Sequence, residues 1–177
     1  MKFYKKEVED ILIASFVLAL SFSIATGMAN LNGFLLVSLI VLPSFLLHEL
    51  AHKFVAQYYG YLAAFLRFDL GLLLALVSSL FGFVFAAPGA VFIQDVRKKE
   101  HLLKISIAGP LTNIALALIG LFIIKSQFGL VFAHINAMLA LFNLIPFGPL
   151  DGFKIFSINK ILWFITTLIA LIVFLAI

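Results

Sequence analysis

Long apolar stretches, separated by short polar breaks, occupy most of this chain of 177 residues. Each stretch is close to the roughly 20 residues that an α-helix needs to cross the hydrocarbon core of a bilayer. The breaks contain turn-forming residues, such as Asn-Leu-Asn-Gly at 30–33 and Lys-Ser-Gln at 125–127. The pattern therefore predicts six apolar segments, at residues 11–28, 34–58, 70–93, 102–124, 128–148 and 161–177.

The third segment, 70–93, is expected to differ from the other five. Residues 70–85 are typical of a helix, but 86–93 include Pro88 and Gly89, which favour an extended segment or a turn. Non-helical backbone at membrane depth occurs only where protein or a wet cavity covers it. We therefore expect a re-entrant element near 70–93, in which a helix is followed by a strand or loop that returns to the side it came from.

The distribution of basic residues predicts the orientation of the chain. With a cytoplasmic amino terminus and a re-entrant third segment, Lys125 is the one basic residue of the twelve outside the cytoplasm. If 70–93 crossed the membrane once, the Arg97-Lys98-Lys99 cluster would lie outside. We therefore expect an all-α polytopic protein of the cell membrane, with about five to six transmembrane segments and a cytoplasmic amino terminus.

Composition supports a membrane protein and excludes several other classes. The chain is 64% hydrophobic and 11% charged, whereas soluble domains carry about 25% charged residues. The net charge of +4 is spread over short loops, so it does not indicate nucleic-acid binding. The chain has no cysteine, which excludes disulfides and thiolate metal ligands. The length predicts a single domain.

One apolar segment contains the motif His48-Glu49-Leu50-Ala51-His52. Ionisable groups at membrane depth cost a few kcal/mol each, so they usually mark a function. Residues four apart share one face of a helix, which allows His48 and His52 to direct both imidazoles at one metal ion. Glu49 is turned aside by about 100° and can reach a metal-bound water as a general base.

A third metal ligand is expected, because a catalytic zinc has three protein ligands and an open position for water. Asp151 is the best candidate, since Pro146 and Pro149 free the backbone before it from a helix at the end of the fifth segment. The other His, Asp and Glu residues considered suit solvated loops or packing better: Asp69, Asp95, Glu100, His101 and His134.

Three motifs together resemble the signatures of the site-2 protease family of intramembrane zinc metalloproteases. They are HELAH at 48–52, Ala-Gly-Pro-Leu-Thr-Asn at 108–113 and Asn-Leu-Ile-Pro-Phe-Gly-Pro-Leu-Asp-Gly at 143–152. The resemblance runs from about residue 30 to residue 156. From the residues alone, Gly109, Pro110 and Asn113 indicate a helix kink and close packing rather than chemistry.

The resemblance implies an intramembrane zinc endopeptidase that cleaves transmembrane protein substrates. It assigns one zinc ion per chain to His48, His52 and Asp151, and the role of general base to Glu49. It also places Asn143 near the catalytic centre, where it would hold the substrate backbone or stabilise the oxyanion. A structural alternative for Asn143 is a hydrogen bond between helices.

The resemblance further implies that the region of Gly89 belongs to a membrane-embedded sheet, which pairs with the substrate as an added strand. The chain shows no PDZ-like or CBS-like module, so we expect one integral-membrane domain over 1–177 whose partners are the lipid bilayer and its substrate, with no nucleic acid. Two other functions stay open: a membrane metal transporter and a catalytically silent zinc-binding scaffold.

Overall fold

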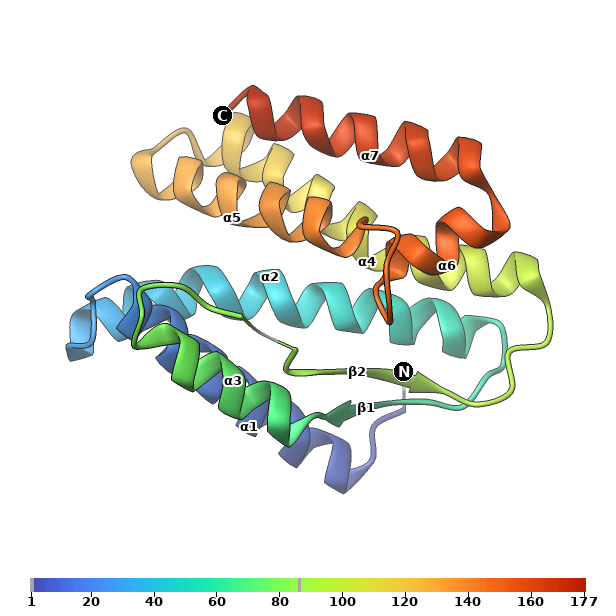
Figure 1. Ribbon diagram of the computed structural model, residues 1–177, viewed down its shortest axis with the longest axis horizontal. Coiled ribbons are helices and arrows are strands. Elements are labelled where there is room, and N and C mark those ends of the chain that lie inside the picture. The colour runs from blue at the N-terminus through green and yellow to red at the C-terminus, as the bar shows by residue number, and fades with distance from the viewer. Residues whose placement is uncertain (1, 86) are drawn as a thin grey trace.

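The computed structural model describes residues 2–85 and 87–177, which are mostly helical and include a small two-stranded sheet (Figure 1). The all-α prediction therefore holds for most of the chain, and the strand expected after the helix of 70–93 is present in this two-stranded sheet. Ala86, which belongs to the predicted extended segment, lies outside the described residues. The elements are α1 Lys5–Ala25, α2 Leu31–Tyr58, β1 Ala63–Arg67, α3 Asp69–Ser79, β2 Gly89–Ile93, α4 Lys99–Ile119, the π-helical η1 Gly120–Ile124, α5 Gln127–Asn143, α6 Asp151–Ile158 and α7 Lys160–Leu175.

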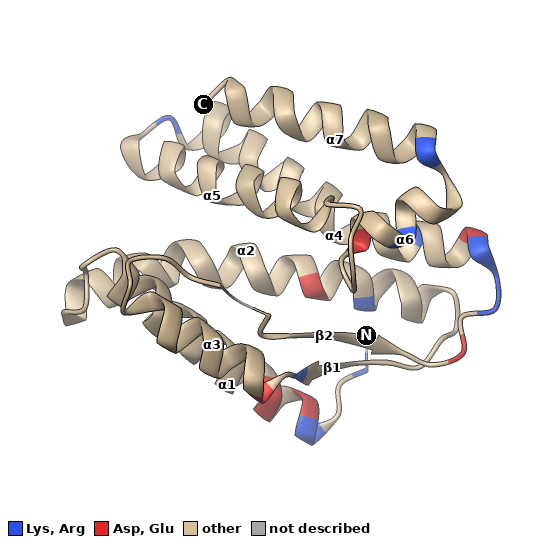
Figure 2. Cartoon of the chain, in the orientation of Figure 1, with Lys and Arg blue, Asp and Glu red and all other residues tan. Residues whose placement is uncertain are grey.

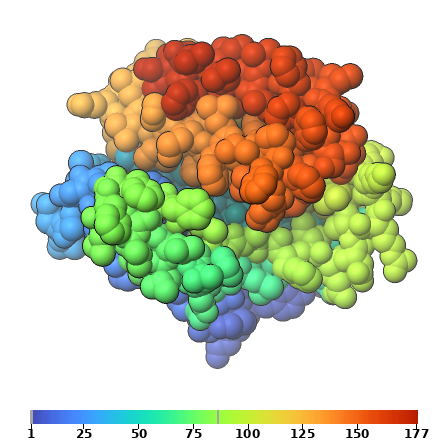
Figure 3. Space-filling model, in the orientation of Figure 1, coloured from blue at the N-terminus to red at the C-terminus, as the bar shows by residue number. Residues whose placement is uncertain are grey.

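The helices pack in two groups that meet along α2 and α4. In Figure 1, α1, α3 and the sheet lie on one side of α2, and α5 and α7 lie on the other. Each group has its own apolar core. Phe45 and Phe65 belong to the core of α1, α2, β1 and α3, whereas Leu144 and Ile155 belong to that of α4 to α7. Figure 3 shows the later elements packed directly on the earlier ones. The motif-bearing part of α2 therefore lies between the two groups.

Three helices are long and apolar enough to cross a membrane: α1, α2 and the continuous helix Lys99–Ile124. Their outer faces expose large apolar side chains, including Phe16 at 59%, Leu39 at 63% and Ile123 at 72%. Such surfaces are expected to contact lipid. The apolar helices α5 and α7 have 17 and 16 residues, which is short of the roughly 20 needed for a span. The count of five to six spans therefore stays a prediction.

The chain just before the predicted re-entrant segment lies beside the end of that segment. Strands β1 and β2 are antiparallel, with partners from Ala63↔Ile93 to Arg67↔Gly89. Beyond the strands, the N–H of Gln94 donates to the carbonyl of Leu62 at 3.0 Å. The return of the chain is therefore a feature of the fold. Strand β1 was not predicted, because its five residues lack the alternation of polar and apolar positions that marks a strand.

The helix of this segment is shorter than predicted, ending at Ser79 rather than near residue 85. Two local features account for the early end. The Ser78 hydroxyl oxygen accepts the N–H of Phe85 at 2.9 Å, and Gly82 has a positive φ of 82°, a conformation that suits glycine and does not continue a helix. At Pro88 the chain is back at the start of α3, where the N–H of Phe68 donates to the carbonyl of Pro88 at 3.0 Å.

A loop between α5 and α6 positions the candidate third ligand. Helix α5 ends at Asn143, before Pro146, and α6 begins at Asp151. The indole N–H of Trp163 in α7 donates to the carbonyl of Leu144 at 2.7 Å, which holds the start of this loop. Asp151 is thereby brought beside α2, although it follows the motif by about one hundred positions in the sequence.

Candidate metal centre

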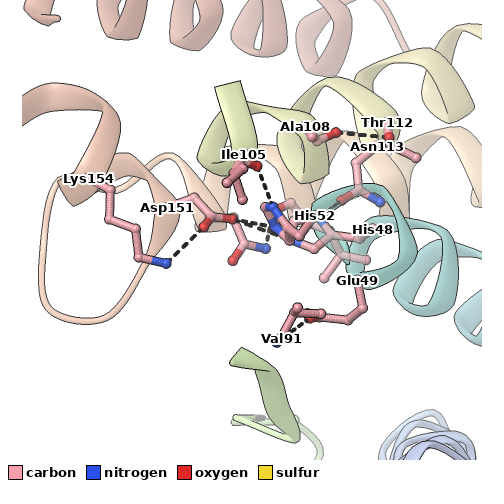
Figure 4. Close-up of polar contacts among 12 residues, drawn as sticks. His48, Glu49, His52, Val91, Ile105, Ala108, Thr112, Asn113, Asp151 and Lys154 are labelled. Atoms are coloured by element: carbon pink, nitrogen blue, oxygen red, sulfur yellow. Dashed lines mark hydrogen bonds and ion pairs between the residues drawn. The ribbon is translucent and has the colours of Figure 1, made fainter. Parts of the chain in front are cut away.

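Three side chains predicted as ligands from the sequence meet in the interior. Asp151 Oδ2 lies 3.0 Å from Nε2 of His52 and 3.4 Å from Nε2 of His48, and the two Nε2 atoms are 3.1 Å apart. All three residues are buried, with exposed fractions of 6–7%. Figure 4 shows the two imidazoles projecting from α2 and the carboxylate reaching them from the start of α6. We refer to His48, His52 and Asp151 as the ligand cluster.

The hydrogen bonds of the two Nδ1 atoms determine which ring nitrogens of His48 and His52 carry protons. Nδ1 of His52 is 2.7 Å from the carbonyl oxygen of Ile105, which can only accept, so this nitrogen is the donor. Nδ1 of His48 is 2.5 Å from Oδ1 of Asn113, which also accepts. In the neutral imidazoles, both Nε2 atoms are then left as lone-pair acceptors that face a carboxylate oxygen. Three acceptors at these distances repel one another unless a proton or a metal ion lies among them.

The geometry of the ligand cluster fits zinc. Zinc bonds of about 2.0–2.2 Å at tetrahedral angles place neighbouring ligand atoms about 3.3–3.6 Å apart, and the separations here are 3.0–3.4 Å. Among the residues that the structure describes, His48, His52 and Asp151 place their ligand atoms within 4.8 Å of one another, close enough to hold one metal ion. The other carboxylate oxygen of Asp151, Oδ1, accepts a hydrogen bond from Nζ of Lys154 at 3.2 Å. Two imidazoles and one carboxylate are consistent with one zinc ion.

Glu49 lies beside the ligand cluster and contacts the sheet. Its Oε2 accepts the backbone N–H of Val91 in β2 at 3.1 Å (Figure 4). A cavity of about 10 Å³ borders Glu49, Lys53 and Phe65 on the side of α2 that faces α1 and β1, and within the described residues its lining includes no member of the ligand cluster. The carboxylate is therefore directed at the edge of β2, while Glu49 itself adjoins His48 in α2.

Helix α4 contacts the imidazoles through a glycine. A Cβ added to Gly109 would lie 2.6 Å from Cε1 of His48 and closer still to the Nε2 atoms of both histidines. The close packing expected at Gly109 is therefore present. Asn113, one turn along the same helix, is predicted to be a packing residue, but its amide oxygen also accepts a hydrogen bond from Nδ1 of His48. Its position four residues after Gly109 was the signal in the sequence, because residues i and i+4 share one helix face.

Asn143 is not joined to the ligand cluster by any hydrogen bond among residues 2–85 and 87–177. Its amide N–H donates to the carbonyl of Leu139, in its own helix, at 3.0 Å. Its role in chemistry stays a prediction. His101 bonds the hydroxyl of Tyr61 at 2.9 Å and His134 lies against Phe174, with ring centroids 4.7 Å apart.

Comparison with known proteins identifies relatives over most of the chain. A protein of Methanocaldococcus jannaschii, named "Putative zinc metalloprotease MJ0611", is 37% identical over 94% of this chain and 92% of its own length. A Bacillus subtilis protein, named "Putative zinc metalloprotease YwhC", is 34% identical over 71% of this chain and 68% of its own length. The "Zinc metalloprotease MJ0392" of M. jannaschii is 32% identical over 80% of this chain and 39% of its own length. No family model and no solved structure matches the chain.

Proposed function

Because the chain belongs to a family of zinc metalloproteases, we propose that it is an intramembrane zinc endopeptidase of the site-2 protease type. It would hydrolyse peptide bonds in or near the transmembrane segments of other membrane proteins. The observation that carries the proposal is the ligand cluster itself: two imidazoles and a carboxylate, buried together beside Glu49, on a helix long and apolar enough to span a bilayer.

The roles of the residues follow from their positions. His48, His52 and Asp151 would hold the zinc ion, and the bound ion would supply Lewis acidity for polarising a carbonyl group and activating water. Glu49, turned aside from the two histidines on α2, accepts the proton of the attacking water and passes it to the leaving amine. Burial of the ligand cluster keeps bulk water from competing.

The outer edge of β2 suits an extended substrate. The interstrand bonds flanking the sheet join Leu62 to Gln94 and Phe68 to Pro88. Since ladder bonds alternate along an antiparallel pair, the N–H and C=O of Val91 point away from β1. They point towards Glu49, which accepts that N–H. A substrate helix must unwind to expose its carbonyls, and pairing with this edge would hold the unwound segment beside the ligand cluster.

We propose a multi-pass topology for one integral-membrane domain, with the amino terminus cytoplasmic. The starts of α1, α4 and α7 and the ends of α2 and α5 lie at the same end of the bundle in Figure 1. Charged residues gather towards that end in Figure 2, whereas Lys125 belongs to the connection between η1 and α5 at the opposite end. This distribution is the one that the positive-inside rule favours.

A cleavage assay tests the proposal directly. Purified protein in detergent is incubated with a panel of single-span substrates, with and without a zinc chelator. Cleavage by the wild-type protein that the chelator abolishes is expected. Glu49→Gln should retain zinc but lose about 100- to 10,000-fold in rate, because an amide cannot accept the proton. Glu9→Gln, on the exposed face of α1, is the matched control and should cleave normally. Wild-type rates in Glu49→Gln would exclude it as the base.

Zinc content tests the ligand assignment separately from cleavage. His48→Ala, His52→Ala and Asp151→Ala should each lose zinc, because a catalytic site needs all three ligands. His134→Ala is the matched control and should keep it, since His134 packs against Phe174. Full zinc occupancy in Asp151→Ala would remove Asp151 from the ligand set.

A proline substitution tests the substrate-binding edge. Val91→Pro removes an N–H that the sheet does not use and that Glu49 accepts, so β2 should stay paired with β1 while KM for the substrate rises. Ala90→Pro removes an N–H that points into the ladder and should weaken the sheet itself. Unchanged KM and kcat in Val91→Pro, with zinc still bound, would exclude substrate pairing at this edge.

A further inference from the structure

A chain of buried hydrogen bonds extends from the ligand cluster across three helices. It starts at His48 and continues through Asn113 of α4 and Asn136 of α5 to Ser44 of α2. Ser44, Asn113 and Asn136 each have an exposed fraction of 0%. Burying two amides and a hydroxyl costs free energy unless every donor and acceptor is matched. The arrangement is therefore expected to serve a specific purpose.

The far end of this chain is anchored on backbone carbonyls, which can only accept. The Ser44 hydroxyl donates to the carbonyl of Ile40 at 2.7 Å, so its oxygen is left to accept. The amide nitrogen of Asn136 donates to that oxygen at 2.8 Å and to the carbonyl of Phe132 at 2.9 Å. Both N–H groups of Asn136 are thereby used, and its carbonyl oxygen must face Asn113.

The same reasoning fixes the next amide. Asn113 donates one N–H to Oδ1 of Asn136 at 2.8 Å and the other to the backbone carbonyl of Ser44 at 3.0 Å. Its own Oδ1 is then directed at Nδ1 of His48, 2.5 Å away. A flipped Asn113 would set oxygen against oxygen at both of its other contacts, so this orientation is the one the surroundings allow.

We propose that Ser44, Asn136 and Asn113 form a tautomer lock for His48, with Asn113 and Asn136 as positioning residues. The lock holds the proton of His48 on Nδ1 and leaves the lone pair of Nε2 for the metal ion. With the reverse tautomer, Nε2 would carry a proton and could not bind zinc. The inference rests on the proposed zinc site but does not depend on which substrate is cleaved.

Zinc affinity in detergent, measured by competition with a chromogenic chelator, tests the contact with His48. Asn113→Leu should lower the affinity about 10- to 100-fold, as loss of a partner to a ligand usually does. Asn113→Asp also loses both donated bonds, but its carboxylate still accepts from Nδ1. It should therefore bind zinc about 10-fold or more tighter than Asn113→Leu, even though both variants unfold at lower temperature than wild type. The d–d absorption of bound Co²⁺ should be wild-type in Asn113→Asp and altered in Asn113→Leu.

Asn136 tests the longer part of the lock. Asn136→Leu should weaken zinc binding less than Asn113→Leu, and adding it to Asn113→Leu should cost nothing further, because Asn136 acts through Asn113. Ser106→Ala is the control: Ser106 is buried on α4, and its hydroxyl has no hydrogen-bond partner within the part of the chain that the structure describes.

The outcomes separate this inference from the proposed zinc site. If wild type and Ser106→Ala fail to bind zinc, the metal site itself is wrong. If they bind zinc, wild-type affinity in Asn113→Leu, or equal losses in Asn113→Asp and Asn113→Leu, would overturn the lock. Should Asn113→Leu not fold, a folded Asn113→Asp that binds zinc more than about 10-fold weaker than wild type would overturn it. Wild-type affinity in Asn136→Leu would remove Asn136 and Ser44 from it.

Discussion

Replacing Gly109 by alanine should destroy the zinc site without removing any ligand. Gly109 lies on the face of α4 that packs against both imidazoles of the ligand cluster. A methyl group there would be 2.6 Å from Cε1 of His48 and nearer still to both Nε2 atoms. The atoms in conflict are the ends of side chains, so the imidazoles are expected to move rather than the helices.

The size of this movement decides the outcome. Carbon atoms in contact are normally about 3.5–4.0 Å apart, so Cε1 of His48 must shift by about 1 Å. Metal sites tolerate deviations of about 0.2 Å in their ligand distances. The displacement is several times that tolerance, and it affects two of three ligands. Zinc affinity is therefore expected to fall by about 100-fold or more, at or beyond the upper range for losing a partner to a ligand.

The assay is zinc affinity by chelator competition, together with thermal unfolding of the metal-free protein in detergent. Gly109→Ala should unfold near the wild-type temperature, because alanine is better than glycine in a helix by up to about 1 kcal/mol. Gly120→Ala is the matched control. Its Cβ would lie 2.6 Å from the backbone oxygen of Gly129, which should lower stability by about 1–3 kcal/mol. Because Gly120 is about 16 Å further along the helix, zinc should stay bound. Wild-type zinc affinity in Gly109→Ala would refute the reasoning.

Three further predictions concern topology, a buried ion pair and the metal. Cysteines placed at Lys98 and Lys125 should label from opposite faces of the membrane; labelling of both from the same face would contradict the proposed topology. Lys53→Met should cost about 3–5 kcal/mol of stability, because it leaves the buried carboxylate of Glu7 without its partner. Adding Glu7→Gln should restore most of that loss, since the amide oxygen still accepts the N–H of Phe65; thermal unfolding that shows no recovery would contradict it. Zinc at 100 times its Kd should raise the free energy of unfolding by about 2.7 kcal/mol, and a chelator should reverse the gain.

The sequence predicted the helices well where a long apolar run ends at a polar break. The predicted segment at 34–58 corresponds to α2, and that at 102–124 lies within the helix Lys99–Ile124. It was less accurate where local bonds oppose the apolar pattern, as at Ser78 and Gly82, where α3 ends early. The strand β1 was missed because a sheet forms through pairing with distant residues, and four apolar residues followed by Arg67 carry no periodicity of their own.

The candidate ligands were readable from the chain because their chemistry is local. His48 and His52 share a helix face by spacing alone, and a carboxylate that follows two prolines within five residues in an apolar context is unusual enough to be noticed. The contacts that orient those ligands were not readable. Asn113 looks like any other amide in an apolar helix, and its partner Asn136 was not singled out at all.

The sequence by itself determined that the chain has helices apolar enough to cross a membrane, which helix carries the motif and which residue types could bind a metal. These follow from hydropathy and from helical spacing, which act over a few residues. Only the tertiary structure decided that Asp151 meets the histidines, that β2 presents Val91 to Glu49 and that three helices share one buried hydrogen-bond chain. The physical reason is that buried polar groups must find partners, and in this fold those partners come from segments tens of residues apart.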